Sequence, residues 1–150
     1  MKKLFITIFS FQMLVFFTGC KEKKMLVENE WIVESIKIRS DSNSGLMYPP
    51  PDFFANPFKG TLTLSLSNKD FVFTTEHIFI LGEVKIGGYK IDFKVASGME
   101  EVVSNESEFS KFCVNLLIND INHYQITNEK LRFTGANGEQ INLIRKIKIY

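Results

Sequence analysis

Apolar and polar residues alternate through most of the chain beyond residue 30, which is the pattern of half-buried β-strands. Leu62, Leu64 and Leu66 are the clearest example, because a polar residue follows each of them. The pattern slips in phase near Ser35, where a β-bulge would accommodate the change. The predicted strands cover 31–38, 61–67, 71–75, 77–86 and 89–95, with three more around Tyr124 and Ile126, Leu131 and Phe133, and Ile141 and Leu143.

Turn-forming residues separate these segments. SNKD at 67–70, TNEK at 127–130 and GANG at 135–138 carry the Asn, Asp, Ser and Gly that favour tight turns. Gly87 and Gly88 are predicted to occupy the central positions of a hairpin turn, because glycine tolerates positive φ at both places. The turns therefore predict neighbouring strands that run antiparallel.

Residues 40–58 predict a long loop, because this segment holds all four prolines together with Asp, Asn, Ser and Gly. Its large apolar side chains form a candidate interaction loop. They are Met47, Tyr48, Phe53, Phe54 and Phe58. Two arrangements are open, an exposed recognition patch and a plug that folds back over one end of the sheet, and we favour the plug.

One amphipathic helix interrupts the strands. Phe109, Phe112, Cys113, Leu116 and Leu117 fall at i, i+3, i+4, i+7 and i+8, which places them on one stripe of an α-helix. Ser104 or Asn105 is the expected N-cap, and the helix should end near residues 119–120. Strands, one helix and more strands predict an α+β fold: an antiparallel, curled or barrel-like sheet with one main helix packed on it.

The N-terminus has a different pattern. Lys2 and Lys3 precede an apolar run from Leu4 to Phe17 that is too short to cross a bilayer and matches the core of a secretory signal peptide. Thr18 and Gly19 then lead to Cys20, and the segment resembles a bacterial lipobox, although Phe17 stands where Leu is usual. The resemblance implies that Cys20 is lipidated and becomes the first mature residue.

The predicted organisation is accordingly a signal peptide at 1–19, a polar tether at 20–29 and one domain at 30–150. The mature chain would carry 16 Lys and Arg against 17 Asp and Glu, because the signal removes only two lysines. A net charge near −1 gives no electrostatic case for binding nucleic acid. With Cys20 acylated, Cys113 has no partner within the chain, so the domain should depend on its apolar core.

Motifs for catalysis, cofactors and metals are missing from the sequence. His77 and His123 stand outside zinc-binding spacings, and the chain has no GxSxG elbow, P-loop or dinucleotide fingerprint. Cys113 lies in mid-helix among Phe and Leu, where a thiol is a packing residue rather than a nucleophile. We therefore expect a protein that is not an enzyme, with no cofactor and no metal.

WIVESI at the start of the domain and EKLRFTGANGEQINLIR near its end resemble the META domain family of small secreted or lipid-anchored bacterial proteins, some linked to stress responses. The matching positions are Trp31, Glu108, Tyr124, Ile126, Leu131, Phe133, Gly138, Leu143 and Arg145. The sequence departs from that family in the middle, where LGEVKIGGY stands in place of the usual GCN segment. The resemblance implies an α+β fold and a non-enzymatic envelope protein, with no ligand to carry over.

Two functions are predicted. The first is a lipid-anchored envelope protein, an interaction or stress-related module whose partner is a protein or a small apolar ligand. The alternative is a lipocalin-like carrier that holds a lipophilic molecule inside its sheet. The membrane is the expected partner of lipidated Cys20, and Lys21, in place of an inner-membrane retention Asp, favours the outer membrane. A filled aromatic core would favour the first function, and an empty apolar cavity the second.

Overall fold

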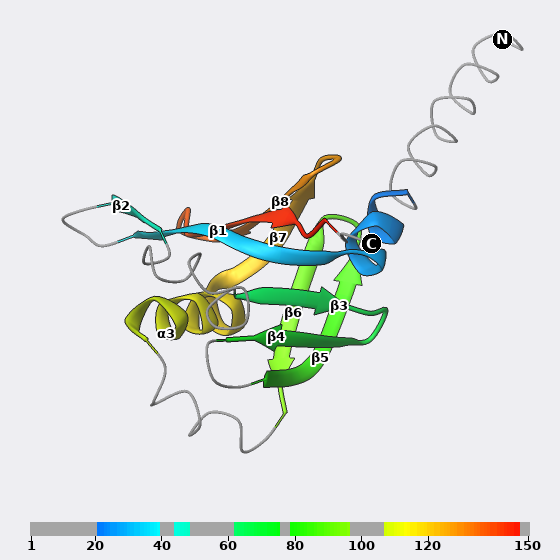
Figure 1. Cartoon of the computed structure of the whole chain (residues 1–150), viewed down its shortest axis with the longest axis horizontal. Helices are drawn as coiled ribbons and strands as arrows, with labels where there is room; N and C mark the ends of the chain where they lie inside the picture. The colour runs from blue at the N-terminus through cyan, green and yellow to red at the C-terminus, as the bar shows by residue number, and fades with distance from the viewer. Residues whose placement is uncertain (1–20, 40–43, 49–61, 76–78, 97–106, 148–150) are drawn as a thin grey trace, which may run out of the picture.

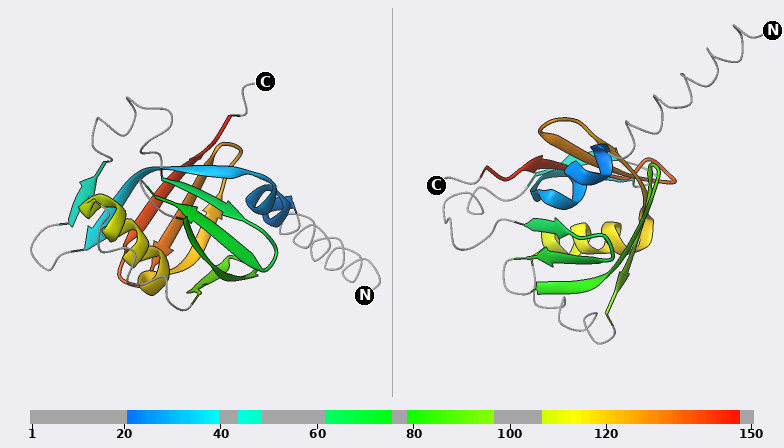
Figure 2. Two further views of the ribbon diagram at one scale, coloured as in Figure 1. Left: turned by 60° about the horizontal axis from the view of Figure 1, so that its bottom comes forward. Right: turned by 90° about the vertical axis from the view of Figure 1, so that its right-hand side faces the viewer.

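The computed structural model describes residues 21–39, 44–48, 62–75, 79–96 and 107–147. Its strands form one antiparallel sheet in the order β2-β1-β3-β4-β5-β6-β7-β8-β9, and β1 also pairs with β9. All strands except β2 thus close into an eight-stranded barrel (Figures 1 and 2). The predicted antiparallel, barrel-like sheet is confirmed. The strands are β1 (Glu30–Arg39), β2 (Ser44–Met47), β3 (Thr63–Leu66), β4 (Asp70–Thr74), β5 (Phe79–Gly87), β6 (Lys90–Val95), β7 (Ile121–Ile126), β8 (Lys130–Gly135) and β9 (Gln140–Arg145).

The barrel interior is filled by aromatic and branched side chains. The rings of Phe71 and Phe93 meet edge-on at 5.1 Å between centroids, and those of Phe93 and Phe133 do so at 5.5 Å. Edge-to-face contacts of this kind stabilise aromatic pairs beyond the burial of their area. Trp31 and Phe73 are fully buried in the same cluster. The alternating pattern thus predicted the inward face of the strands correctly.

The closure of the barrel joins the first and last strands of the domain. Trp31 pairs with Arg145, Ser35 with Asn142 and Lys37 with Gln140. The register shifts between Val33 and Ser35, which confirms the predicted bulge. On the far side of the barrel β6 and β7 share a single register pair, Lys90 with His123, so the two strands meet only near the β5–β6 turn.

The helical region consists of α3 (Glu108–Asn115) followed by a π-helical turn, η2 (Leu116–Asp120). Its N-cap is Ser107, whose hydroxyl accepts a hydrogen bond from the backbone N–H of Ser110. The expected caps at 104 and 105 were therefore wrong. η2 contacts β6, β7, β8 and β9, so the helical region packs directly on the sheet (Figure 2).

The buried stripe of this helix is rotated from the predicted one. Cys113 and Leu117 are buried as expected, but Phe112 is 41% exposed. Ser110 and Val114 are buried instead. Sequence periodicity overestimated the burial of Phe112, because apolar spacing alone cannot show which edge of a wide stripe packs against the barrel.

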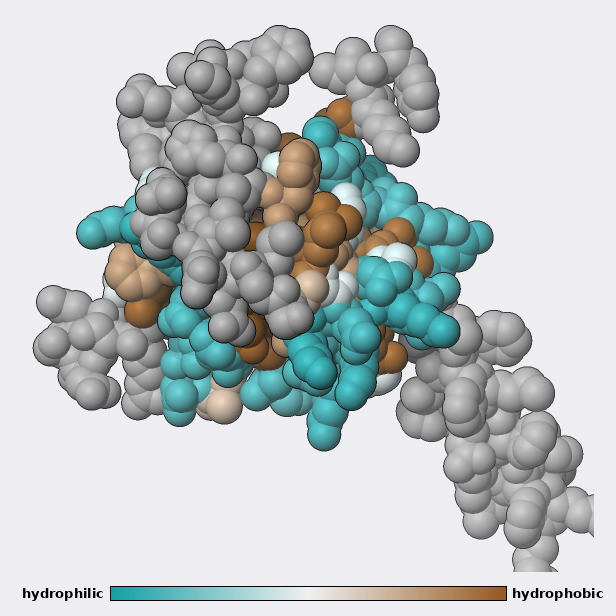
Figure 3. All heavy atoms as spheres, turned by 90° about the horizontal axis from the view of Figure 1, so that it is seen from below, coloured by the Kyte–Doolittle hydropathy of each residue, from teal (hydrophilic) through white to brown (hydrophobic). Residues whose placement is uncertain are grey.

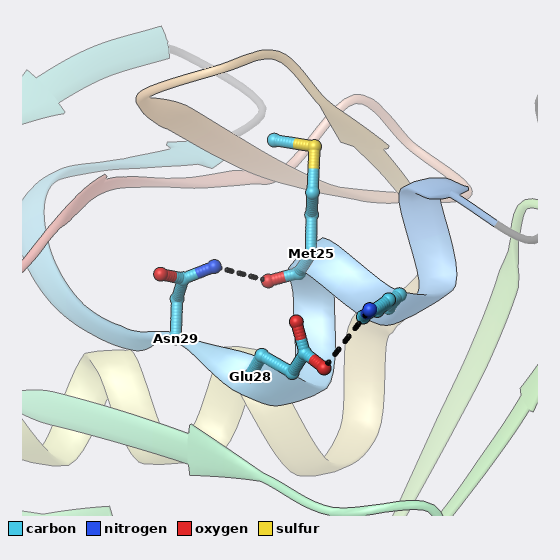
Figure 4. A network of polar contacts seen from close by, with 4 residues as sticks. Met25, Glu28 and Asn29 are labelled. Carbon is cyan, nitrogen blue, oxygen red and sulfur yellow. Dashed lines mark hydrogen bonds and ion pairs between the residues drawn. The ribbon is translucent and has the colours of Figure 1, made fainter.

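The segment expected to be a polar tether is structured. Residues 21–28 are helical, and Leu26 is fully buried in the core. The Asn29 amide donates to the carbonyl of Met25 at 2.7 Å (Figure 4), and the Trp31 indole N–H donates to the carbonyl of Leu26 at 3.1 Å. These bonds satisfy carbonyls that a helix end leaves without partners.

Within the described residues, no helix has the length and apolar character needed to cross a bilayer.

Two turn and loop predictions also need correction. Residues 44–47 form β2, paired with the end of β1, inside a segment expected to be loop throughout. Gly87 pairs with Lys90, so Gly88 and Tyr89 form the hairpin loop, one residue later than predicted. Only Gly88 has the positive φ, +58°, that such a turn demands of a glycine.

Candidate functional site

A groove on the outer face of the barrel is the best-formed candidate site. It has a volume of about 600 Å3 and crosses the strands β7, β8, β9 and β1, with β2 at one rim. We call it the outer groove. Its polar lining includes Glu34, Gln125, Thr127, Lys130, Arg132 and Gln140. These side chains point outward because their neighbours along each strand point into the barrel.

A row of polar side chains runs across the floor of this groove. Gln125 pairs with Arg132, Arg132 with Asn142, and Asn142 with Ser35, so one residue from each of four adjacent strands lies at the same level. Arg132 Nε donates to Asn142 Oδ1 at 3.1 Å, and Asn142 Nδ2 donates to Ser35 Oγ at 3.1 Å. The bulge in β1 turns Ser35 outward beside Glu34, which brings it into the row.

The rim of the outer groove carries the exposed part of the predicted interaction loop. Tyr48 is 63% exposed and Leu46 is 48% exposed, and both line the groove. Met47 points the other way and packs partly buried against the core. The predicted interaction loop therefore grouped side chains that point in opposite directions, because residues 46 and 48 face one side of the extended chain and residue 47 faces the other. Cys20, Phe53, Phe54 and Phe58 lie outside the described residues.

Two carboxylates meet where η2 joins β7. Glu139 is almost fully buried, and its Oε2 accepts a hydrogen bond from the backbone N–H of Asn137 at 3.0 Å. Burial raises the pKa of Asp120, and the neighbouring Glu139 carboxylate adds to that shift. The hydrogen bond to Asn137 gives Glu139 a structural role in the β8–β9 turn. Within the described part of the chain, no three His, Cys, Asp or Glu side chains gather as a metal site needs.

The remaining titratable group of chemical interest is Cys113. Its thiol is completely buried, and this burial raises its pKa far above the ordinary value. A thiol that resists ionisation is a poor nucleophile, since the thiolate is the reactive form. Cys113 is therefore a packing residue, as its place in the helix predicted.

A second hollow of about 810 Å3 lies against β4, β5 and β6, around Gly82, Leu81 and Val95. Phe79 and Leu81 are exposed on β5. Figure 3 shows that apolar residues reach the surface on the underside of the molecule, interspersed with polar ones. Asp70, Glu83 and Lys94 occupy paired positions across this surface. Among its described residues, no side-chain hydrogen bonds link neighbouring strands as they do in the outer groove.

Comparisons with known proteins extend the description of the fold. No family model matches the chain, and no curated protein matches it either. A DUF4847 family protein from Bacteroides vulgatus has a similar structure, with a TM-score of 0.59 and 12% identity over 85% of this chain and 99% of its own. A protein from Burkholderia xenovorans, solved by NMR, has a TM-score of 0.58 and 14% identity over 83% of this chain and 86% of its own. These likenesses support the fold, and the META resemblance stays a prediction.

Sequence reasoning missed the polar row. Gln125, Arg132 and Asn142 each follow the alternation of their own strand, so they read as ordinary solvent-facing positions. The available signal was that three consecutive strands carry a planar polar side chain between two apolar ones. Placing these side chains side by side requires the strand register, which the alternation does not specify.

Proposed function

We propose that this protein is a non-enzymatic, lipid-anchored module of the cell envelope that binds its partner at the outer groove. Cys20 would carry the lipid after removal of residues 1–19, with the outer membrane as the expected location. The observation that supports a binding surface on the outside of the barrel is the filled interior. Phe71, Phe93 and Phe133 occupy the space in which a carrier would hold its ligand.

The filled interior favours this proposal over a lipocalin-like carrier. Barrels of eight strands have an interior just large enough either to be filled by side chains or to hold one small ligand. Here the aromatic rings touch one another across the barrel. The exposed aromatic and apolar residues at the groove rim, Tyr48 and Leu46, are instead placed to meet a partner from outside.

Site-specific crosslinking in intact cells tests the binding face. A photoreactive amino acid at Leu46 should yield a discrete adduct, whereas the same group at Phe79 should not. Both positions are exposed and apolar, but only Leu46 lines the outer groove. Adducts from Phe79 alone, or the same adducts from both positions, would place the partner elsewhere.

The anchor is tested by changing one atom. Cys20→Ser should leave an unprocessed precursor and abolish palmitate labelling, because a hydroxyl does not replace the thiol as the acceptor of the lipid. Cys113→Ser provides the matched control and should retain both processing and label. Persistent labelling of Cys20→Ser would contradict the proposed anchor.

A further inference from the structure

We infer that the outer groove is a saccharide-binding site whose ligand is a neutral oligosaccharide. The inference rests on the proposed function, because it assigns a ligand class to the same groove. Three observations carry it: a row of polar side chains on four adjacent strands, an exposed tyrosine at the end of that row, and a lining with little net charge.

The row covers four strands and continues to Tyr48, the residue that follows β2. Met47 pairs with Ile36, so Tyr48 lies at the level of Ser35 on the next strand, beside the row of Ser35, Asn142, Arg132 and Gln125. Neighbouring strands are about 4.8 Å apart, and the row is therefore roughly 19 Å long. A pyranose unit is about as long as one strand spacing, so a short chain of sugars can follow the row.

Hydrogen bonds within the row orient its polar groups. Asn142 uses its amide oxygen for Arg132 and its amide nitrogen for Ser35, which is only 4% exposed. Arg132 has five N–H donors, of which the bond to Asn142 uses one. Within the described residues no carboxylate forms an ion pair with Arg132. Arg132 and Gln125 both line the groove. The planar fork of a guanidinium offers parallel donors of the kind that pairs of adjacent hydroxyls can accept.

Tyr48 supplies the apolar part of the recognition. Tyr48 is 63% exposed at the groove rim. A tyrosine offers a large, rigid surface with few rotatable bonds, together with a hydroxyl that forms hydrogen bonds. The C–H face of a pyranose can lie on such a ring while its hydroxyls reach the polar row.

The charge and polarity of the lining argue against polyphosphates, nucleic acids and lipid chains. Glu34 offsets one of the two cations, Lys130 and Arg132, so the groove lacks the basic character that a polyphosphate or nucleic acid requires. A lipid chain is also unsuitable, because it would cover the amide and guanidinium groups without replacing their hydrogen bonds to water. A neutral ligand that both donates and accepts hydrogen bonds fits the lining best.

Glycan binding by the full-length protein tests the inference. The protein is purified in a detergent without a sugar headgroup and applied to an array of neutral hexose and N-acetylhexosamine oligosaccharides. The best-bound glycan is then titrated by calorimetry. Tyr48→Ala should weaken binding about tenfold or more, because a contacting tyrosine often carries a large share of the binding energy. Gln125→Ala should also weaken binding.

Tyr89→Ala is the matched control, because Tyr89 is 58% exposed but lies in the β5–β6 turn, outside the outer groove. It should bind like the unaltered protein, and all variants should melt at similar temperatures. An array without any bound glycan, or equal binding by the Tyr48 and Tyr89 variants, would overturn the saccharide inference. If a blank array accompanies a protein adduct at Leu46, the saccharide inference fails while the proposed function stands.

Discussion

Gly82 shows how a single residue determines the packing of two strands and a core ring. It faces the barrel interior in β5, opposite Phe71 of β4 and Val95 of β6. A Cβ at this position would lie 2.6 Å from Phe71 Cε1 and would overlap the carbonyl oxygen of Lys94. The absence of a side chain lets the Phe71 ring pack against the backbone. The sequence marked this glycine only as a break in an apolar run.

We predict that Gly82→Ala destabilises the fold by about 1–3 kcal/mol, the usual penalty for overpacking a core. Chemical denaturation measures the change in the free energy of unfolding. Gly87→Ala is the control, because a Cβ there would meet nothing within 4 Å. Equal effects of the two substitutions would show that close packing at Gly82 is not what demands glycine.

At the scale of elements, the local sequence pattern predicted the positions of the strands but not the contacts where elements join. Eight of the nine strands lie where the sequence pattern predicted them. β2 was not predicted, because it contains a glycine and prolines follow it closely. The junction between η2 and β8 depends on a close approach of Gly135, which the sequence pattern also did not predict. Gly135 lies so close to the Asp120 carbonyl and the Glu139 carboxylate that a Cβ would meet them at 2.7 and 2.6 Å. Two acids are thereby held together beside the end of a helix.

This junction predicts a pH-dependent stability. Burial and Glu139 raise the pKa of Asp120 in the folded state, so ionised Asp120 opposes folding. The destabilising contribution of Asp120 should therefore disappear as the pH falls through this raised pKa towards the unfolded value near 3.9. Asp120→Asn removes the charge and should raise the melting temperature at neutral pH, with the difference shrinking as the pH falls.

Thermal melts between pH 3 and 8, roughly the range in which a shifted carboxylate titrates, measure this dependence. Asp92→Asn, at an exposed position of β6, is the control for removing one negative charge. A gain at Asp120→Asn that stays constant with pH would contradict the electrostatic explanation.

At the scale of the whole molecule, barrel closure decides what is inside and what is available for binding. Pairing of β1 with β9 brings residues more than a hundred positions apart into contact, as in the 2.8 Å ion pair between Glu30 and Lys146. The closed barrel directs Phe71, Phe93 and Phe133 inward, where they fill the interior. Among the described residues, the outward side chains of β1, β7, β8 and β9 then form one shared surface, the outer groove.

A filled interior has a measurable consequence. Phe93→Ala should lower the free energy of unfolding by about 3–5 kcal/mol, because Phe93 lies between Phe71 and Phe133 and contacts both edge-on. Phe112→Ala is the control, since Phe112 is 41% exposed, and it should have a much smaller effect. A loss below about 1 kcal/mol for Phe93→Ala would indicate a loosely filled barrel and would strengthen the carrier alternative.

The sequence by itself determined which residues of most strands face the core, where most turns fall and that the sheet is antiparallel. These properties depend on neighbours within a few positions, and Leu62, Leu64 and Leu66 express them directly. Only the tertiary structure decided that Ser35, Asn142, Arg132 and Gln125 stand in one row and that Tyr48 lies beside them. The physical reason is that an outward polar residue has the same local pattern whether it meets water or a ligand. Its neighbours across the sheet are set by strand register and closure, which depend on contacts between distant parts of the chain.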